Sequence, residues 1–204
     1  MTDALESNVD ESLPLISIVV PSYNQAKFLA RCLDSILIQN YPMLECLVQD
    51  GGSTDGTLDL LRSYDERVSW ASAPDGGQAA AINTGLVKSS GSIVCYLNSD
   101  DALPAGTLHH VGRFFLANSD VDLMYGRAQV IDEQDRYLAD YPTCDWDWGK
   151  YQSACLICQP AAFMRRGLWD KVGQFNETMV CSMDYEYWMR AHLLGAIIRH
   201  EPIM

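Results

Sequence analysis

Four short apolar segments define the first half of the chain, and each is followed by a polar or glycine-rich turn and a stretch with helical spacing. The apolar segments are residues 15–20, 44–49, 68–73 and 93–97. Short apolar segments between turn residues are typical of buried strands, whereas apolar residues at i, i+3, i+4 and i+7 are typical of amphipathic helices. Strands and helices that alternate in this way form crossover units, whose parallel strands are covered by helices on both faces. The alternation therefore predicts an α/β fold with a mostly parallel central sheet flanked by helices.

The second half of the chain lacks this regular alternation. Residues 121–130 and 196–199 are predicted strands, and residues 184–194 form the last predicted helix. Because a length of 204 residues fits one domain or at most two, we expect this half to extend the same sheet and to form the second wall of one cleft. The predicted organisation is an acidic N-terminal tail, residues 1–14, followed by one domain, residues 15–204. The two halves of that domain are residues 15–103 and residues 104–204.

The charge of the chain excludes several classes of partner. It has 14 Lys and Arg residues and 27 Asp and Glu residues, so its formal net charge is 14 − 27 = −13. Proteins that bind nucleic acid or anionic membrane surfaces rely on an excess of basic side chains. No apolar run approaches the roughly 20 residues of a membrane span, and the acidic start of the chain is the opposite of a signal peptide. The seven scattered cysteines suit a reducing compartment. We therefore expect a cytoplasmic protein without a nucleic-acid partner or a transmembrane segment.

The turns after the four predicted strands are rich in carboxylates and small polar side chains. These turns are residues 21–24, 50–57, 75–78 and 98–101. The carboxyl ends of the strands of an open parallel sheet lie at one edge, where ligands bind. A role in turns or helix capping explains any single loop, and Asp55 fits a cap. Four consecutive loops of this composition favour a ligand site. The carboxylates that would converge there are Asp50, Asp75, Asp100 and Asp101.

The class of ligand follows from what these loops lack and what they contain. The glycine-rich turn matches neither the dinucleotide-binding fingerprint nor the phosphate-binding loop with its lysine. An acidic edge repels a phosphate group unless a divalent cation lies between them. Mg²⁺ and Mn²⁺ prefer oxygen ligands, typically one or two carboxylates together with substrate phosphates. The segment after the fourth strand, residues 98–101, is therefore the predicted site of Mn²⁺ or Mg²⁺. Asp50 and the turn at Ser22 and Tyr23 are left to bind a base and ribose.

Several motifs follow one another along most of the chain. They are Val20-Pro21-Ser22-Tyr23-Asn24, residues 50–57, residues 75–78, residues 81–85, residues 96–101, Gln159-Pro160, residues 163–166, residues 173–177 and residues 183–190. On these motifs, the segment from Ser17 to Arg199 resembles the family 2 glycosyltransferases, whose catalytic domain has the GT-A fold and uses nucleotide-diphospho-sugars. Each motif alone is moderately specific, but their order over about 180 residues is highly specific.

The resemblance implies roles for individual residues. The implied nucleotide-sugar site consists of Pro21, Ser22, Tyr23, Asp50, Asp75, Gln78, Asn83, Asn98, Ser99 and Asp100. Asp100 would be the main metal ligand, with Asp101 and His200 as further candidates, and Asp184 would be the catalytic base. Two positions depart from the family pattern: Asn98 replaces the first carboxylate of the D-x-D metal motif, and Met183 stands where the family often has glutamate.

The implied activity is the transfer of a sugar from a nucleotide-diphospho-sugar to an acceptor hydroxyl, with a divalent cation and with inversion. We expect a UDP-linked donor and a saccharide or lipid-linked saccharide acceptor, in the synthesis of a bacterial surface polysaccharide at the inner face of the membrane. Two other classes stay open. One is a non-catalytic or partial nucleotide-sugar-binding protein, because the family usually continues beyond the point that corresponds to Met204. The other is a nucleotidyltransferase, although such enzymes usually carry a basic glycine-rich loop that this sequence lacks.

Three further groups of residues have two interpretations each. Trp146, Trp148 and Tyr151 would stack on a sugar or pack in the core. Arg165 and Arg166 would clamp a diphosphate or an anionic acceptor, or form a solvated surface pair. The Cys155-x-x-Cys158 motif has the spacing of half a zinc site but no second pair, which favours two core thiols.

Overall fold

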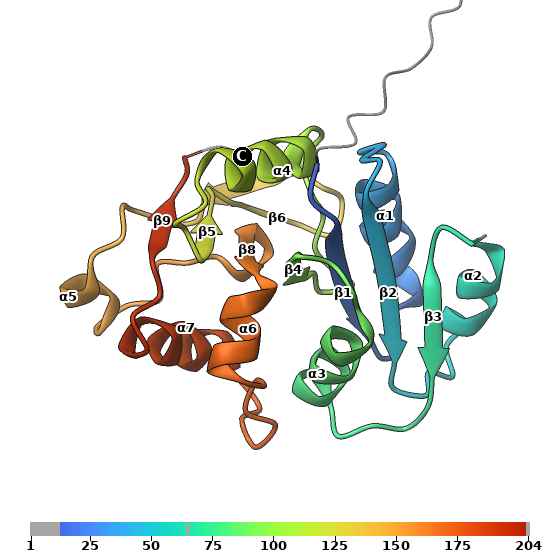
Figure 1. The fold of residues 1–204 in the computed structure, drawn as a ribbon. Helices are drawn as coiled ribbons and strands as arrows, with labels where there is room; N and C mark the ends of the chain where they lie inside the picture. Colours follow the sequence, from blue (N-terminus) through green and yellow to red (C-terminus); the bar gives the residue numbers. More distant parts are fainter. Residues whose placement is uncertain (1–12, 65, 203–204) are drawn as a thin grey trace, which may run out of the picture.

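The structure is a computed structural model that describes residues 13–64 and 66–202 (Figure 1). The first twelve residues of the predicted acidic tail lie outside the described residues. Leu13, which was placed in that tail, is buried in the core instead, with 5% of its surface exposed. The apolar core therefore includes Leu13.

Strands and helices alternate along the first half, as the sequence predicts. The strands are β1 (Ile16–Ser22), β2 (Leu44–Asp50), β3 (Ser69–Ser72), β4 (Ile93–Tyr96), β5 (Leu123–Tyr125), β6 (Gln129–Ile131), β7 (Tyr137–Asp140), β8 (Ala162–Arg165) and β9 (Ile198–His200). The helices are α1 (Ala26–Leu37), α2 (Thr57–Ser63), α3 (Gln78–Lys88), α4 (Thr107–Ala117), α5 (Trp148–Tyr151), the 3₁₀ turn η1 (Gln159–Ala161), α6 (Arg166–Val172) and α7 (Met183–Leu193).

Seven strands form one sheet in the order β3-β2-β1-β4-β8-β5-β9. All pair in parallel except β8, which runs antiparallel to both β4 and β5. The prediction of a mostly parallel sheet in an α/β domain is therefore confirmed. The carboxyl ends of β1, β2, β3 and β4 lie at one edge, and the start of the reversed strand β8 lies at the same edge. Residues from both halves of the chain thus meet there.

The predicted strand over residues 121–130 is wrong in its extent. The chain leaves the sheet after β5, and β6 pairs antiparallel with β7 in a separate hairpin. Most of the hairpin side chains are exposed, so its apolar residues do not follow the pattern of a buried strand.

Apolar side chains cover both faces of the sheet. Ile18 and Val20 of β1 point to one face, where α1 and α4 pack, and Val19 points to the other, where α3, α6 and α7 pack (Figure 1). Because β1 is buried on both faces, its sequence is a continuous apolar run rather than an alternation. In the part of the chain that the structure describes, no helix is both long and apolar enough to span a membrane.

We expect Gly85→Ala to destabilise the protein. Gly85 of α3 lies so close to β1 that an added Cβ would stand 2.4 Å from Cγ1 and 2.8 Å from Cγ2 of Val19. Such overpacking typically costs about 1–3 kcal/mol of unfolding free energy. Urea denaturation measures the change. Gly167→Ala in α6 is the matched control, because no atom lies within 4 Å of its added Cβ and alanine favours a helix by about 1 kcal/mol. Equal effects of the two substitutions would contradict the close packing of α3 on β1.

Candidate active site

A cavity of about 670 Å³ opens at the edge where β1, β2 and β4 end. This volume lies within the usual range of small-molecule sites. Eight of the ten predicted nucleotide-sugar residues line it, namely Pro21, Ser22, Tyr23, Asp75, Gln78, Asn98, Ser99 and Asp100. The topology explains this convergence, because parallel strands deliver their following loops to one edge.

Two polar groups on residues that line this cavity have no partner among the described residues. The Ser22 hydroxyl is buried, yet no hydrogen bond to it is formed among the described residues. The carboxylate of Asp100, in an exposed residue of the loop after β4, also forms no hydrogen bond or ion pair within the described part of the chain. Because buried polar groups are almost always paired in native proteins, the orphaned hydroxyl points to a ligand in this cavity.

Asp50 shapes the cavity without lining it. Its Oδ2 accepts hydrogen bonds from the Gly52 and Ser53 backbone amides at 3.0 and 2.9 Å and from the Ser72 hydroxyl at 2.6 Å. Its Oδ1 accepts a hydrogen bond from the Ser53 hydroxyl. The side chain is buried, with 3% exposed, and is fully occupied in holding the turn after β2. Asp50 therefore positions the wall at Gly51, where an added Cβ would lie 3.3 Å from both Tyr23 and Asp75.

Asn83 also lies outside the cavity lining. Its Nδ2 donates to the Phe175 carbonyl and to Oε1 of Glu177, both at 2.9 Å, and its Oδ1 accepts from the Phe175 amide at 2.9 Å. This buried amide therefore ties α3 to the segment before α7. Its role in the described protein is to join the two halves of the domain.

A chain of three side-chain amides crosses the edge of the sheet. Gln78 donates from Nε2 to Oδ1 of Asn98 at 2.6 Å, and Asn98 donates from Nδ2 to Oε1 of Gln159 at 3.3 Å. Gln159, the buried first residue of η1, donates in turn to the Tyr96 carbonyl at 2.6 Å. The sequence analysis includes Gln159 among the family motifs but does not connect it with Asn98. The Gln-Pro pair before β8 was the one available signal.

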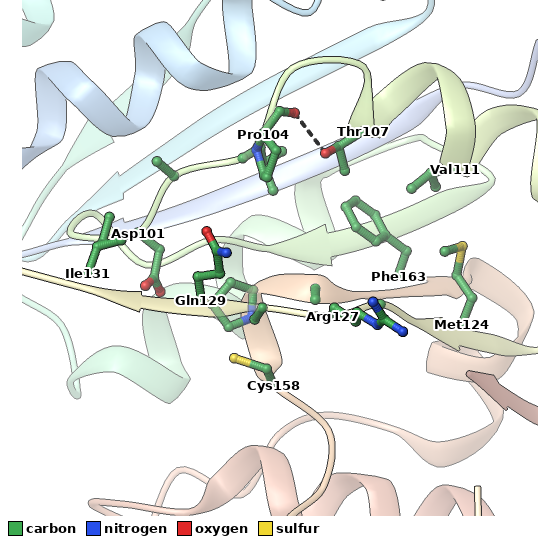
Figure 2. A pocket seen from close by; sticks show the side chains of 16 residues that line it. Asp101, Pro104, Thr107, Val111, Met124, Arg127, Gln129, Ile131, Cys158 and Phe163 are labelled. Atoms are coloured by element: carbon green, nitrogen blue, oxygen red, sulfur yellow. Dashed lines mark hydrogen bonds between the residues drawn. The ribbon is translucent and has the colours of Figure 1, made fainter. Parts of the chain in front are cut away.

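Asp101 faces a second cavity and not the first. This cavity of about 400 Å³ is lined mainly by apolar side chains of the loop after β4, of α4, of the segment from β5 to β6 and of the segment from η1 to β8, with Asp101 and Cys158 at one end (Figure 2). Burial, and next the neighbouring charge of Asp100, raises the pKa of Asp101 from 3.8 to about 6, although a hydrogen bond from Asn98 acts in the opposite direction. The two adjacent carboxylates of the metal motif thus lie in different environments.

We expect Asp101→Asn to stabilise the protein at neutral pH. The folded pKa is raised, so this group favours folding below the pKa of the unfolded chain, and that contribution is lost as the pH rises through about 6. Two pKa units correspond to about 3 kcal/mol, so the amide should gain about 2–3 kcal/mol at pH 7.5 and about half of that at pH 5. Urea denaturation of both proteins at the two pH values measures this gain. A gain that does not depend on pH, or a loss at pH 7.5, would contradict the prediction.

Asp184 lies in the first turn of α7 and is half-buried. Burial, and after it the charges of Asp101, Cys155 and Asp184 in that order, raise the pKa of the Cys158 thiol to about 12. Burial raises the pKa of Tyr96 well above its usual value, and Asp184 is the next largest cause. Since Tyr96 ends β4 directly before the metal motif, Asp184 and that motif lie on the same side of the sheet edge.

His200 is engaged at the far edge of the sheet. It ends β9, the third strand from β4, which corresponds to about 14 Å across the sheet. Its Nδ1 lies 3.0 Å from Oδ1 of Asp145, and its ring stacks on Tyr125 with 5.0 Å between ring centroids. Within residues 13–64 and 66–202, no group of three or more His, Cys, Asp or Glu side chains is arranged to hold a metal ion. Among the candidate ligands, Asp100 is therefore the carboxylate that is open to the first cavity.

Both interpretations of Arg165 and Arg166 are wrong. Arg165 donates from Nη2 to the carbonyls of Phe115 and Asn118, at 2.8 and 2.9 Å, where α4 ends. Arg166 donates in the same way to the Leu86 carbonyl at 3.0 Å, where α3 ends. Cations at the carboxyl end of a helix satisfy carbonyls without an intrahelical partner and complement the helix dipole. The two arginines fasten β8 to the helices on either face.

The aromatic residues of the second half pack against one another. Tyr151 is fully buried and lies 4.8 Å from Trp146, and Trp148 stacks on His192 at 4.2 Å, measured between ring centroids. Core packing accounts for Tyr151, while both tryptophans are half-buried. Cys155 and Cys158 are free and partly buried, as expected for packing thiols.

Comparison with known proteins assigns this chain to a family. The family model described as Glycosyl transferase family 2 matches residues 17–171. A PGL/p-HBAD biosynthesis glycosyltransferase of Mycobacterium bovis is 31% identical over 190 residues, which are 91% of this chain and 72% of that protein.

Solved structures share the fold. TarS of S. aureus in complex with UDP-GlcNAc has a TM-score of 0.78 at 22% identity, over 93% of this chain and 56% of that chain. The mannosyltransferase PcManGT of Pyrobaculum calidifontis, in complex with GDP-Man and Mn²⁺, has a TM-score of 0.73 at 24% identity, over 93% of this chain and 55% of that one. The chain spans little more than half the length of these two structures, and it has the GT-A fold that the sequence resemblance implied. Together with the family model, which matches most of its length, this shows that the chain belongs to glycosyl transferase family 2.

Proposed function

We propose that this chain transfers a sugar from a nucleotide-diphospho-sugar, with UDP favoured as the nucleotide, to an acceptor hydroxyl. The observation that carries the proposal is the cavity at the strand ends. Eight predicted donor residues line it, and among them the Ser22 hydroxyl and the Asp100 carboxylate have no partner in the described part of the chain. The complexes of TarS with UDP-GlcNAc and of PcManGT with GDP-Man support a nucleotide-sugar donor. The acceptor is proposed to be a saccharide or lipid-linked saccharide in bacterial surface polysaccharide synthesis, as the family resemblance implies.

The residues of the cavity fit a divalent cation. Asp100 provides a hard oxygen ligand without another partner, in a cavity large enough for a diphosphate beside it. One protein carboxylate together with substrate phosphates is a usual arrangement for Mg²⁺ and Mn²⁺. When bound, the cation would offset the negative charge that grows on the departing diphosphate. PcManGT, which is solved with Mn²⁺, supports this assignment.

The protein's own groups would perform the remaining steps. Tyr23, with 62% of its side chain exposed above the cavity, offers a ring for a base to stack on. Asp184 would accept the proton of the acceptor hydroxyl as that oxygen attacks the anomeric carbon and the bond to the diphosphate breaks. A single base on the face opposite the leaving group gives inversion.

The experiment is a donor panel. UDP-, GDP- and dTDP-linked sugars are incubated with the protein, with Mn²⁺ or with EDTA, and the release of nucleoside diphosphate is followed with and without saccharide acceptors. The proposal expects release from at least one donor that is stimulated by an acceptor and abolished by EDTA. Donor binding without turnover would instead support the non-catalytic alternative. Release of pyrophosphate from a nucleoside triphosphate and a sugar phosphate would support the nucleotidyltransferase.

A further inference from the structure

The direction of the amide chain at the sheet edge is fixed at one end. Gln159 is buried, with 7% exposed, and its terminal amide lies 2.6 Å from the Tyr96 backbone carbonyl. A carbonyl oxygen can only accept a hydrogen bond, so the atom of Gln159 that faces it must be the amide nitrogen. The other terminal atom, Oε1, is then an acceptor that faces Asn98.

The orientation of Gln159 determines the orientation of the next two amides, up to the one that lines the cavity. Because Gln159 presents an acceptor, Asn98 must turn its Nδ2 toward it, and that contact measures 3.3 Å. The Oδ1 of Asn98 is left to accept from Nε2 of Gln78 at 2.6 Å. Gln78 is the first residue of α3 and lines the cavity, and its Oε1 has no hydrogen-bond partner among the described residues. Gln159 therefore orients Asn98, which also donates to Asp101, and Asn98 orients Gln78.

We propose that Gln159 is a positioning residue that makes Gln78 present its carbonyl oxygen to a hydroxyl group of the donor. The inference rests on the proposed function, since it concerns how that donor is recognised. A carbonyl oxygen requires a partner that carries a hydrogen atom, which the ionised diphosphate lacks. A ribose hydroxyl and a hydroxyl of the transferred sugar both have this chemistry. The hydrogen bond from this donor hydroxyl to Gln78 would discriminate among donors, whereas the cavity as a whole would provide most of the binding free energy.

The same constraint explains the amide at position 98. An aspartate there would still accept from Gln78, but it could not donate to Oε1 of Gln159. It would also place a third carboxylate beside Asp100 and Asp101. The departure from the D-x-D pattern is therefore matched to the glutamine at position 159.

The experiment compares hydroxyl discrimination in wild type and in Gln159→Met by calorimetric titration with Mn²⁺ present. The ligands are UDP, 2′-deoxy-UDP, 3′-deoxy-UDP and UDP-GlcNAc. If a ribose hydroxyl is the partner, one deoxy ligand should bind wild type about fivefold more weakly than UDP, the value of one hydrogen bond. If a sugar hydroxyl is the partner, UDP-GlcNAc should bind about fivefold more tightly than UDP. In Gln159→Met the ratio of the two affinities, whichever pair of ligands wild type discriminates, should fall to less than about twofold. The reason is that the amides behind Gln78 are no longer oriented.

Gln39→Met is the matched control. Gln39 is also a buried glutamine whose Nε2 donates to two backbone carbonyls, those of Ser35 and Pro104 at 2.9 and 2.8 Å, but it has no contact with Asn98. The Gln39→Met variant should lose stability but keep the wild-type ratio of ligand affinities. Asn98→Leu is the second variant. It removes the acceptor that orients Gln78, so it should lose the wild-type ratio even if Gln159→Met fails to fold.

The titrations separate the inference about Gln159 from the proposed function. A wild-type ratio of affinities that is lost in Gln159→Met or Asn98→Leu and kept in Gln39→Met supports the inference. UDP binding with no discrimination by wild type, or with a ratio that survives in the folded variants, would overturn it and leave the proposed function intact. No binding of any of these ligands would overturn the UDP-linked donor itself and the inference with it.

Discussion

Replacement of Asp184 by asparagine is expected to lower kcat for sugar transfer by about 100- to 10,000-fold, while the KM for the donor changes little. The amide has nearly the shape of the carboxylate but cannot take the proton of the acceptor hydroxyl, and general-base catalysis is usually worth this much. Since the proposed function places Asp184 on the acceptor and not on the nucleotide, the loss should appear in kcat. Steady-state kinetics with the most active donor and acceptor measure both constants.

Glu186→Gln is the control for this substitution. Glu186 lies in the same first turn of α7, so its loss removes the same charge from the same helix end. Its carboxylate, however, pairs with Arg190 at 2.5 Å. The control should retain kcat within about twofold, because an ion pair of this kind contributes mainly a few tenths of a kcal/mol to stability. If both variants lose activity equally, the loss is caused by the removal of negative charge from the start of α7, and Asp184 is not the base.

Replacement of Asp100 by asparagine is expected to lower kcat/KM by about 100- to 1000-fold. Stabilisation of a leaving group by a cation is worth several kcal/mol, and each 1.4 kcal/mol is about a factor of ten in rate. The neutral amide is a weaker ligand, so the remaining activity should require a higher Mn²⁺ concentration than wild type. Activity measured over a range of Mn²⁺ concentrations tests both effects.

Asp59→Asn is the matched control for Asp100. Asp59 is an exposed carboxylate of α2, with 84% of its side chain accessible, and it pairs only with Arg62. Its removal changes the net charge equally and should leave the Mn²⁺ dependence unchanged. If Asp100→Asn keeps the wild-type response to Mn²⁺, Asp100 is not the metal ligand.

The sequence predicted which residues line the first cavity because its geometry depends on local rules. Ser22 ends a parallel strand, and Asp75 and Asp100 lie in the loops after two others, so the order of strands along the chain was enough to bring them to one edge. The strands themselves were readable as short apolar runs between turn residues. The antiparallel strand β8 was not, because its place between β4 and β5 is set by packing with segments far away in the chain.

The residues whose roles could not be predicted have their partners far away in the sequence. Asp50 looked like a ligand-binding carboxylate, but the Ser72 hydroxyl from the next strand occupies it. Asn83 is held by Phe175, and Gln159 orients Asn98 across a separation of 61 residues. No periodicity or motif records such contacts, because each depends on how the two halves of the domain pack.

The most direct test of the account is the affinity for UDP measured by titration calorimetry in Mn²⁺ and in EDTA, for wild type and Asp100→Asn. The account holds that an acidic edge binds a diphosphate through a cation on Asp100. Wild type should therefore bind UDP at least about 100-fold more tightly in Mn²⁺ than in EDTA, and Asp100→Asn should show less than about a tenth of that difference. Equal affinity of wild type for UDP in Mn²⁺ and in EDTA would contradict it.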